Sequence, residues 1–385
     1  MSAFRPLANL RVPLSNPALQ YRRFSATPTR CLSAVFAETE NDELNKLLID
    51  VQEKIILPAY LPEAQRKIVY NPSKSDYMRR NPVVIELDGL EHTFSPINKM
   101  DDIPNSKSAL ANATKLMKTK EEWDNIATFL AGYKKAGIKL KRVHYESLVR
   151  RACAAQQEYS IIECAKQVDK TGLALKSETS IILLMSSINQ KIYDSTRNDA
   201  DTNQALKWNK MIWDLIQRPE HQSKDRRPRE LPHFNPAIRG TFLFSQAHEI
   251  QAKQAAGESV EGLTKELRDN VEFIISAWAG QELDDLSKSS YLESLNGRSK
   301  QGPWNDAVLA PYYYIKALAQ NIKAMELAQE IIGDDAKDLS PIHDAMEKHI
   351  QDFVKARSEN KKGYGLEYES ITGRKPAWEQ YLNKD

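Results

Sequence analysis

The chain has 385 residues, of which 41% are hydrophobic and 28% charged, and its formal net charge is +2 at pH 7. This composition is typical of a folded protein that is large enough for one long core or two domains, and it argues against a strongly basic chain that coats RNA. No apolar run approaches the ~20 residues that would cross a bilayer, so no membrane span is expected.

The first 37 residues contain no Asp or Glu, whereas arginines are spread among Ser, Thr, Pro and Leu. An acid-free, Arg-rich, Ser-containing start is typical of a mitochondrial transit peptide; the alternative is an ordinary basic tail. Arg22-Arg23-Phe24-Ser25 resembles a matrix-peptidase site. We therefore predict a transit peptide over 1–37, cleavage near 24/25 and a matrix location. Removing residues 1–24 takes away four Arg and no acids, so the net charge of +2 becomes −2.

Residues 38–105 are predicted to form an N-terminal helix followed by a proline-rich extended arm. Apolar residues recur at helical spacing over 40–56, and Pro58 ends that helix. Six prolines then interrupt residues 58–105, which favours short extended pieces lying on a surface. Asp88-Gly89 follows an apolar run and predicts one short hairpin.

A sequence repeat marks the helical-repeat domain predicted over 106–217. The segment 135–141 (Lys-Ala-Gly-Ile-Lys-Leu-Lys) returns 35 residues later as 170–176 (Lys-Thr-Gly-Leu-Ala-Leu-Lys). Each copy closes one helical stretch and leads into the next, with its Gly as a left-handed cap. A period in the mid-thirties is typical of stacked helical hairpins. We therefore predict an all-α fold, a helical-hairpin repeat array with helices near 108–117, 121–135, 141–155, 159–170, 177–192 and 203–217.

A linker, a second helical domain and a tail are predicted for the rest of the chain. Residues 218–240 hold four prolines, which exclude a long helix, and six Lys and Arg, so a basic, extended linker is expected. In residues 358–385 basic and aromatic residues show little helical periodicity, which favours an irregular tail. The C-terminal helical domain, 241–357, has predicted helices over 241–256, 260–281, 306–332 and 341–357.

No motif in the chain points to catalysis. There is no G-x-x-x-x-G-K-[ST] or G-x-G-x-x-G phosphate loop and no G-x-S-x-G elbow. His248-Glu249 begins like a zinc-peptidase site, but Ala252 stands where the second His belongs. Cys153 and Cys164 lack companion zinc ligands and are interpreted as small core residues. We expect no catalytic residue, no metal site, no cofactor and no small-molecule substrate.

Three basic clusters are candidate contact sites. The first surrounds the turn at 134–142, with Arg150-Arg151 one helix later; its alternative interpretation is a set of solvated helix faces. The second is the linker, where RNA or protein contact is favoured. The third is the tail, whose aromatic rings can stack on bases. The residues predicted to contact RNA or protein are Arg226, Arg227, Arg229, Arg239, Lys361, Lys362, Tyr364 and Trp378.

The repeat resembles the pentatricopeptide family, whose units are helix pairs of this length, over roughly residues 106–195. In that family two positions of each unit read a base, and the resemblance places them at Ser147 and Ser177. Ser/Ser is not a favoured reading pair, and a useful code needs many more units. The resemblance therefore implies a degenerate repeat scaffold.

The order of the parts is similar to that of fungal-type accessory proteins of mitochondrial ribosomes: import signal, proline-rich arm, helical-repeat body, basic linker and aromatic-basic tail. This resemblance implies a non-catalytic structural component, expected in the large subunit, that binds mitochondrial rRNA and neighbouring ribosomal proteins. Two alternatives stay open. One is a pentatricopeptide-like factor for mitochondrial RNA processing or translation, and the other is an assembly factor for a respiratory complex that binds only protein.

Overall fold

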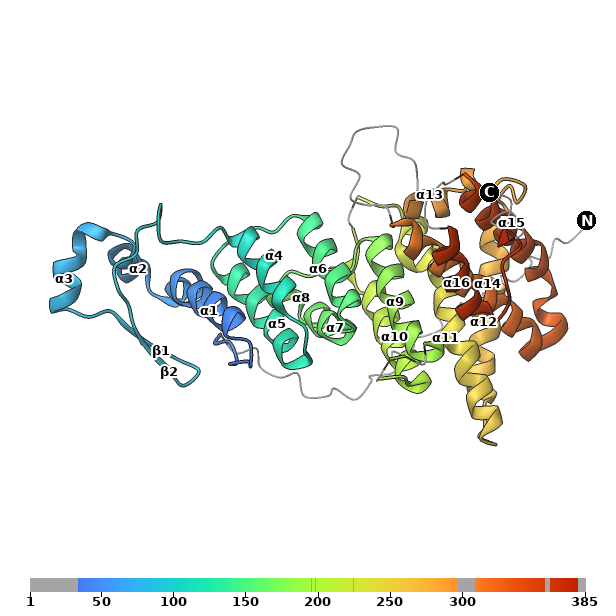
Figure 1. The fold of residues 1–385 in the computed structure, drawn as a ribbon, viewed down its shortest axis with the longest axis horizontal. Coiled ribbons are helices and arrows are strands. Elements are labelled where there is room, and N and C mark those ends of the chain that lie inside the picture. The colour runs from blue at the N-terminus through green and yellow to red at the C-terminus, as the bar shows by residue number, and fades with distance from the viewer. Residues whose placement is uncertain are drawn as a thin grey trace, which may run out of the picture. The chain divides into compact units, whose positions relative to one another are not determined.

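The computed structural model describes residues 34–194, 196–197, 199–223, 225–296, 309–356 and 361–379, without the side chains of Asn296 and Lys361. These residues belong to one compact unit (Figure 1). Most of the predicted transit peptide, including its cleavage site, lies outside the described residues. At its predicted end, the Ala37 N–H donates to Asn125 Oδ1 at 2.8 Å and the Asn125 amide donates back to the Ala37 carbonyl.

The first helix begins after Asn41. The Asn41 side chain accepts a hydrogen bond from the Leu44 N–H and so caps α1 (Asp42–Val51), whose apolar face is buried. The helix continues as a wider π-turn, η1 (Gln52–Ile56), and then as a 3₁₀ turn, η2 (Leu57–Tyr60), which contains a proline. The helix predicted over 40–56 is therefore confirmed, with a change of pitch in its last turn.

The proline-rich arm contains two short helices that the sequence pattern did not predict. Pro62 precedes α2 (Glu63–Val69), and the 3₁₀ turn η3 (Pro72–Lys74) leads into α3 (Ser75–Arg80). Proline is tolerated there because the first N–H groups of a helix have no partner within it. The expectation of extended pieces is therefore wrong for these residues.

The predicted hairpin is confirmed. Strands β1 (Val84–Leu87) and β2 (Leu90–Thr93) pair antiparallel, with Leu87 opposite Leu90. Asp88 and Gly89 have φ angles of 51° and 82°, the left-handed pair that a two-residue hairpin turn requires. The arm has a small core of its own, formed by Leu57, Leu61, Val69, Met78, Val83, Phe94 and Ile97.

The helices of the repeat region follow the predicted hairpin pattern. Gly137 and Gly172, with φ of 75° and 74°, lie in the same left-handed conformation after α5 and α8. Trp123 is fully buried, and its indole donates to the Met117 carbonyl at 3.1 Å. The helices are α4 (Ser106–Leu116), α5 (Lys120–Lys135), α6 (Arg142–Ala154), α7 (Glu158–Lys166), α8 (Val168–Thr171) and α9 (Glu178–Tyr193).

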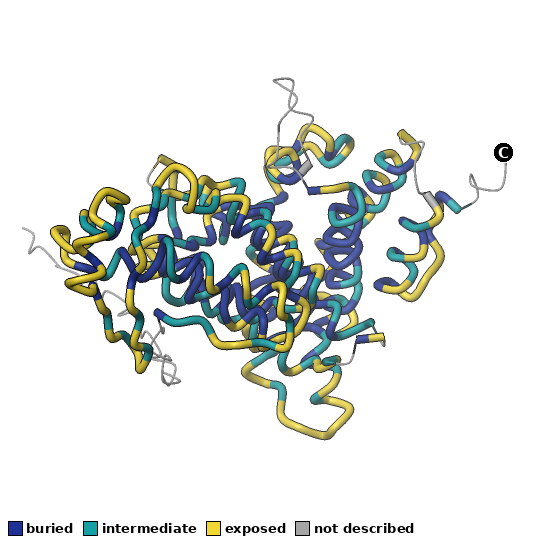
Figure 2. The backbone as a smooth tube through the Cα atoms, turned by 60° about the vertical axis from the view of Figure 1, so that its left-hand side comes forward, coloured by how far each residue is buried: buried dark blue, intermediate teal, exposed yellow. Residues whose placement is uncertain are grey.

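The helices that follow continue the same core. α11 packs along α14, while α9 and α10 both pack on α11. One set of buried hydrophobic residues runs from Leu44 to Trp378, and Figure 2 shows it as the buried inner faces of the helices. None of the described helices combines the length and apolar character that crossing a membrane requires. These helices are α10 (Thr202–Gln217), α11 (Pro236–Ala255), α12 (Glu261–Trp278), α13 (Ser290–Asn296), α14 (Pro311–Ile332), α15 (Ser340–Lys355) and α16 (Lys361–Thr372).

A buried polar network joins the repeat region to the C-terminal helices. The Asn189 amide on α9 donates to the Thr241 carbonyl of α11 at 2.9 Å and to Gln320 Oε1 of α14 at 3.0 Å. At Gly240 the α11 backbone comes so near α14 that a Cβ atom would lie 1.8 Å from Asn321 Oδ1. Because an unpaired buried polar group is costly, this network favours one register among the three helices.

Residues 361–372 form α16, so the prediction of an irregular tail is wrong there. Two glycines lower the helical propensity of this segment, but α16 packs on α14. Its buried residues Tyr364, Tyr368 and Ile371 recur at i, i+4 and i+7. That spacing is a helical signal that was present in the sequence.

Candidate RNA and protein contact surfaces

The linker is a series of turns held against the repeat region. Asn235 caps α11, so residues 236–240 are helical and the extended part ends at 235. His221 is buried; burial lowers its pKa, and the neutral ring accepts a hydrogen bond from the Leu175 N–H at 3.0 Å through Nδ1. The 3₁₀ turns each begin at a proline: η4 (Pro219–His221), η5 (Pro228–Glu230) and η6 (Pro232–Phe234).

The three neighbouring linker arginines differ in how strongly they are engaged. Arg226 is bound to Glu178 of α9, with 2.7 Å between guanidinium and carboxylate. The Arg227 side chain is 86% exposed, and its nearest acid, Glu230, is 3.6 Å away. Arg229 is exposed and forms no ion pair with another described residue. Arg227 and Arg229 can therefore reach a partner's phosphate freely, whereas Arg226 would first have to leave Glu178.

Arg239, also predicted as a contact residue, is built into the fold. Its guanidinium lies 3.6 Å from the centre of the Phe273 ring and 4.9 Å from that of Trp213. Its Nε donates to the His233 carbonyl at 2.9 Å. Burial lowers the pKa of Arg239 to about 10, so the side chain stays charged at neutral pH. These contacts give the half-buried Arg239 a structural role, and its contact with RNA or protein stays a prediction.

The aromatic residues of the tail face inward, which corrects a prediction. Tyr364 is buried, and Trp378 has only 1% of its surface exposed. The Trp378 ring packs against Tyr368, with 5.0 Å between ring centres. Neither predicted anchor is available to stack on a base in this structure. Lys362 is exposed, whereas the side chain of Lys361 lies outside the described part of the chain.

An ionic cluster holds the end of the tail. The Arg374 guanidinium lies 2.8 Å from Glu326 of α14 and also pairs with Glu347 of α15. The Nε2 atom of His343 is 3.3 Å from the same Glu326 carboxylate. Glu326, His343 and Glu347 are close enough to hold a metal ion, but the guanidinium already lies between the two carboxylates. The cluster therefore acts as a tether for the tail.

The base-reading positions implied by the pentatricopeptide resemblance are not both open. Ser177 has only 7% of its surface exposed, and its hydroxyl accepts a hydrogen bond from Arg142 at 3.2 Å. A side chain that is buried and bonded within its own chain cannot read a base edge without giving up that bond. The arrangement supports a scaffold more than a sequence reader.

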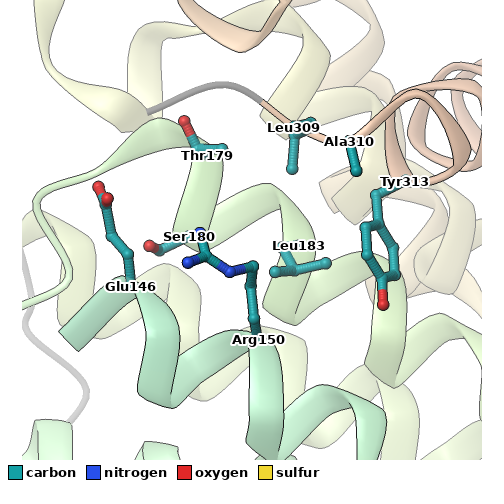
Figure 3. A pocket seen from close by; sticks show the side chains of 8 residues that line it. All are labelled: Glu146, Arg150, Thr179, Ser180, Leu183, Leu309, Ala310 and Tyr313. Carbon is teal, nitrogen blue, oxygen red and sulfur yellow. The ribbon is translucent and has the colours of Figure 1, made fainter. Parts of the chain in front are cut away.

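Two hollows in the described part of the chain differ in size and lining. The first lies among α6, α9 and the start of α14, where Arg150 points toward Ser180 (Figure 3); its 20 Å³ admits little more than a water molecule. The second, a groove of about 440 Å³, is lined by residues from Asp284 to Glu293, by Tyr314, and by α15. Four acids line this groove: Asp284, Asp285, Glu293 and Asp352. They would repel phosphates, so the groove is a candidate surface for a basic segment of a protein.

Comparison with known proteins gives the family of the chain. Residues 22–374 match the model of a family described as mitochondrial ribosomal protein mS27. A curated relative from Neurospora crassa, the small ribosomal subunit protein mS27, is 27% identical over 337 residues, which is 83% of each chain. Since the family model covers most of the 385 residues, the chain belongs to the mitochondrial ribosomal protein mS27 family and is a non-catalytic ribosomal protein of the mitochondrial matrix.

Proposed function

We propose that this chain is a structural component of the small subunit of the mitochondrial ribosome, where its helical body acts as a scaffold for rRNA and neighbouring proteins. The observation that carries the proposal is the similarity to the small-subunit relative over 83% of both chains. The sequence-based expectation of the large subunit finds no support in these comparisons. Family membership also favours a ribosomal role over the two alternatives, an RNA-processing factor and a respiratory-complex assembly factor.

The architecture supports a passive scaffold. A continuous core and a polar network tie α9, α11 and α14 together, so the helical body presents its surfaces in one arrangement. Exposed cations stand on the linker at Arg227 and Arg229 and on the tail at Lys362, whereas the acidic groove by α15 offers the opposite charge. We infer that the cations approach RNA and that the groove accepts a basic segment of a neighbouring protein.

The predicted transit peptide is part of the proposal. The family match begins at residue 22, close to the expected cleavage at 24/25, which supports a removable leader ahead of the body. The hydrogen bonds between Ala37 and Asn125 also favour keeping Ala37 in the mature chain. N-terminal sequencing of the protein isolated from mitochondria tests this directly, and a mature start beyond residue 37 would contradict it.

The test is sedimentation of matrix extract through a sucrose gradient at low and high salt. A structural component of the small subunit should migrate with small-subunit rRNA and remain there at about 0.5 M salt, because its contacts with neighbouring proteins are not lost with the phosphate contacts that salt weakens. Migration with the large subunit would refute the assignment to the small one. Loss from all particles at moderate salt would indicate a transient factor, and migration with a membrane complex would indicate an assembly role.

A further inference from the structure

The two copies of the repeated turn carry lysines at equivalent positions of the sequence repeat. The segments 135–141 and 170–176 each include the end of a helix, pass through a left-handed glycine and lead into the next helix. Lys135 and Lys170 each stand two residues before that glycine. Lys141 directly precedes α6, and Lys176 lies two residues before the start of α9.

Hydrogen bonds hold the two turns side by side. The Lys134 ammonium donates to the Asp169 carbonyl at 2.6 Å and to the Val168 carbonyl at 3.2 Å. The Arg142 guanidinium donates to the Ser177 hydroxyl at 3.2 Å. The residues 134–142 and 168–178, which we call the turn edge, are therefore one continuous surface.

The linker continues the turn edge. The Leu175 N–H donates to His221, and Arg226 pairs with Glu178, so the segment that carries Arg227 and Arg229 lies next to the second turn. Three stretches that are far apart in the sequence thus meet on one side of the repeat region.

The turn edge concentrates positive charge. Its 20 residues contain seven Lys and Arg and two acids, a net charge of +5, whereas the whole chain has +2. One of the acids, Glu178, is already bound to Arg226. All seven cations are exposed, and only Arg142 forms an ion pair with another described residue, Glu146. Lys134 donates to carbonyl groups and Lys135 lies over the Tyr60 ring. Four lysines have neither kind of contact: Lys139, Lys141, Lys170 and Lys176.

The chemistry of this surface favours phosphate over protein. Stable protein interfaces have an apolar or aromatic centre. Every large hydrophobic residue exposed in the described part of the chain lies outside the turn edge: Ile49, Tyr77, Val84, Met100 and Leu366. Lysines on flexible stems, without a large exposed hydrophobic residue among them, suit the phosphate backbone of a nucleic acid.

We propose that the turn edge binds the phosphate backbone of a double-helical RNA without reading its sequence. This inference rests on the proposed function, because it names the surface by which the scaffold contacts rRNA. Ser177 is bonded to Arg142, and side chains cannot read base edges in the deep, narrow major groove of an RNA double helix. The exposed lysines of the two joined turns instead lie on one surface, which can follow a charged backbone.

The test uses the purified full chain and a fluorescent mixed-sequence RNA duplex, titrated over a range of salt concentrations. In the test variant the four lysines without an ion pair, carbonyl or ring contact become Gln: Lys139→Gln, Lys141→Gln, Lys170→Gln and Lys176→Gln. In the matched control four exposed lysines of other elements become Gln: Lys46→Gln, Lys207→Gln, Lys265→Gln and Lys337→Gln. Thermal unfolding of both variants verifies that the fold is kept.

Four lost phosphate contacts should reduce the slope of log affinity against log salt by about 3 and weaken binding by on the order of 100-fold near 0.15 M salt. The control variant should bind within about threefold of the unchanged chain, and a second duplex of unrelated sequence should bind equally well. If the test variant binds as tightly as the control, or if polyglutamate competes better than RNA, the inference fails.

Sedimentation separates this failure from failure of the proposed function. If the unchanged chain migrates with the small subunit but the test variant binds RNA normally, the function stands and the turn edge is not its RNA surface. If the unchanged chain does not migrate with the small subunit, the proposed function fails whatever the duplex titration shows.

Discussion

Two segments rich in basic residues, the linker 218–235 and the tail 361–379, lie in opposite environments. The linker leaves Arg227 and Arg229 in solvent, whereas the tail buries Tyr364 and Trp378. An aromatic side chain removes 150–250 Å² of surface from water when it packs, at roughly 25 cal/mol per Å², while an arginine is costly to bury without partners. The tail is therefore held mainly by its buried aromatic rings, whereas the linker is held by polar contacts of His221 and Arg226 and keeps its other arginines in solvent.

The largest change in stability is expected when the main packing contact of the tail is removed. Trp378→Ala should lower the free energy of unfolding by about 3–5 kcal/mol, because a buried Trp loses both its transfer energy and its packing. Urea denaturation at pH 7 measures the change. Lys375→Ala, an exposed neighbour, should stay within about 0.5 kcal/mol and serves as the control. An unchanged midpoint for Trp378→Ala would mean that the tail is detached in solution.

Glu367 makes polar contacts that hold α16 on α14. Its carboxylate accepts from the Tyr312 hydroxyl at 2.5 Å and lies 3.8 Å from the buried Lys316 ammonium. Glu367→Gln leaves that ammonium without its counter-ion and should cost about 2–4 kcal/mol at pH 7. Burial lowers the pKa of Lys316 to about 8, so the loss should shrink as the pH rises above 8. A loss that stays the same at pH 9 would show that Lys316 is not involved.

Arg239 lies on α11, within the linker predicted from the sequence, and tests whether an arginine of that segment stabilises the fold. Arg239→Met keeps the aliphatic stem but loses the contact with the Phe273 and Trp213 rings and the bond to the His233 carbonyl. We expect a loss of about 1–2 kcal/mol in urea denaturation. Arg229→Ala should change the stability by less than about 0.5 kcal/mol. If both variants changed the stability equally, Arg239 would contribute no more to the fold than the exposed Arg229.

The tether of the tail should respond to pH through His343. Its hydrogen bond to Glu326 raises the pKa of His343, with a further contribution from Asp344. A raised folded-state pKa means that this stabilisation is complete below the unfolded value of about 6.5 and is lost as the pH rises through the folded value. The stability difference between the unchanged chain and His343→Gln should therefore be largest near pH 6 and shrink towards pH 8.5. A difference that grows with pH would show that the protonated His343 ring is not the stabilising form.

The smallest effect on stability is expected for the linker arginines. Replacing Arg226, Arg227 and Arg229 together by Ala should change the free energy of unfolding by no more than about 1 kcal/mol, because only Arg226 has a close ion-pair partner. The same variant should leave ribosomal particles at a lower salt concentration than the unchanged chain. Sedimentation at stepped salt measures this, and an unchanged release point would exclude the linker from particle binding.

Much of the fold could be predicted because its signals are local. The repeated turn, the left-handed glycines and the Asp88-Gly89 hairpin depend on backbone conformations that few residues can adopt. Helix boundaries in the repeat region follow from apolar spacing within one segment. The short helices α2 and α3 were missed because prolines were interpreted as breakers, although a proline at a helix start is tolerated.

The candidate site was harder to predict, since contact residues are defined by what else is near them. The basic cluster at 134–142 was visible in the sequence, but the turn edge needs the second turn to lie beside the first. The equivalence of Lys135 with Lys170 and of Lys141 with Lys176 within the repeat was the signal that could have revealed it. The predicted aromatic anchors failed for the opposite reason, because burial depends on neighbours that are distant in sequence.

By itself, the sequence determined the helical class, the repeat and its turns, and the charge that each segment carries, because these depend on residues within about one helical turn of each other. Only the tertiary structure decided which charges remain free. Arg197 and Glu158 form a pair that is fully buried, with 3.1 Å between them, and nothing in their local sequence distinguishes them from Arg227 and Glu230 at the surface. The energy of a charge depends on the solvent and the partners around it, and in this chain those partners come from helices that are far apart in the sequence.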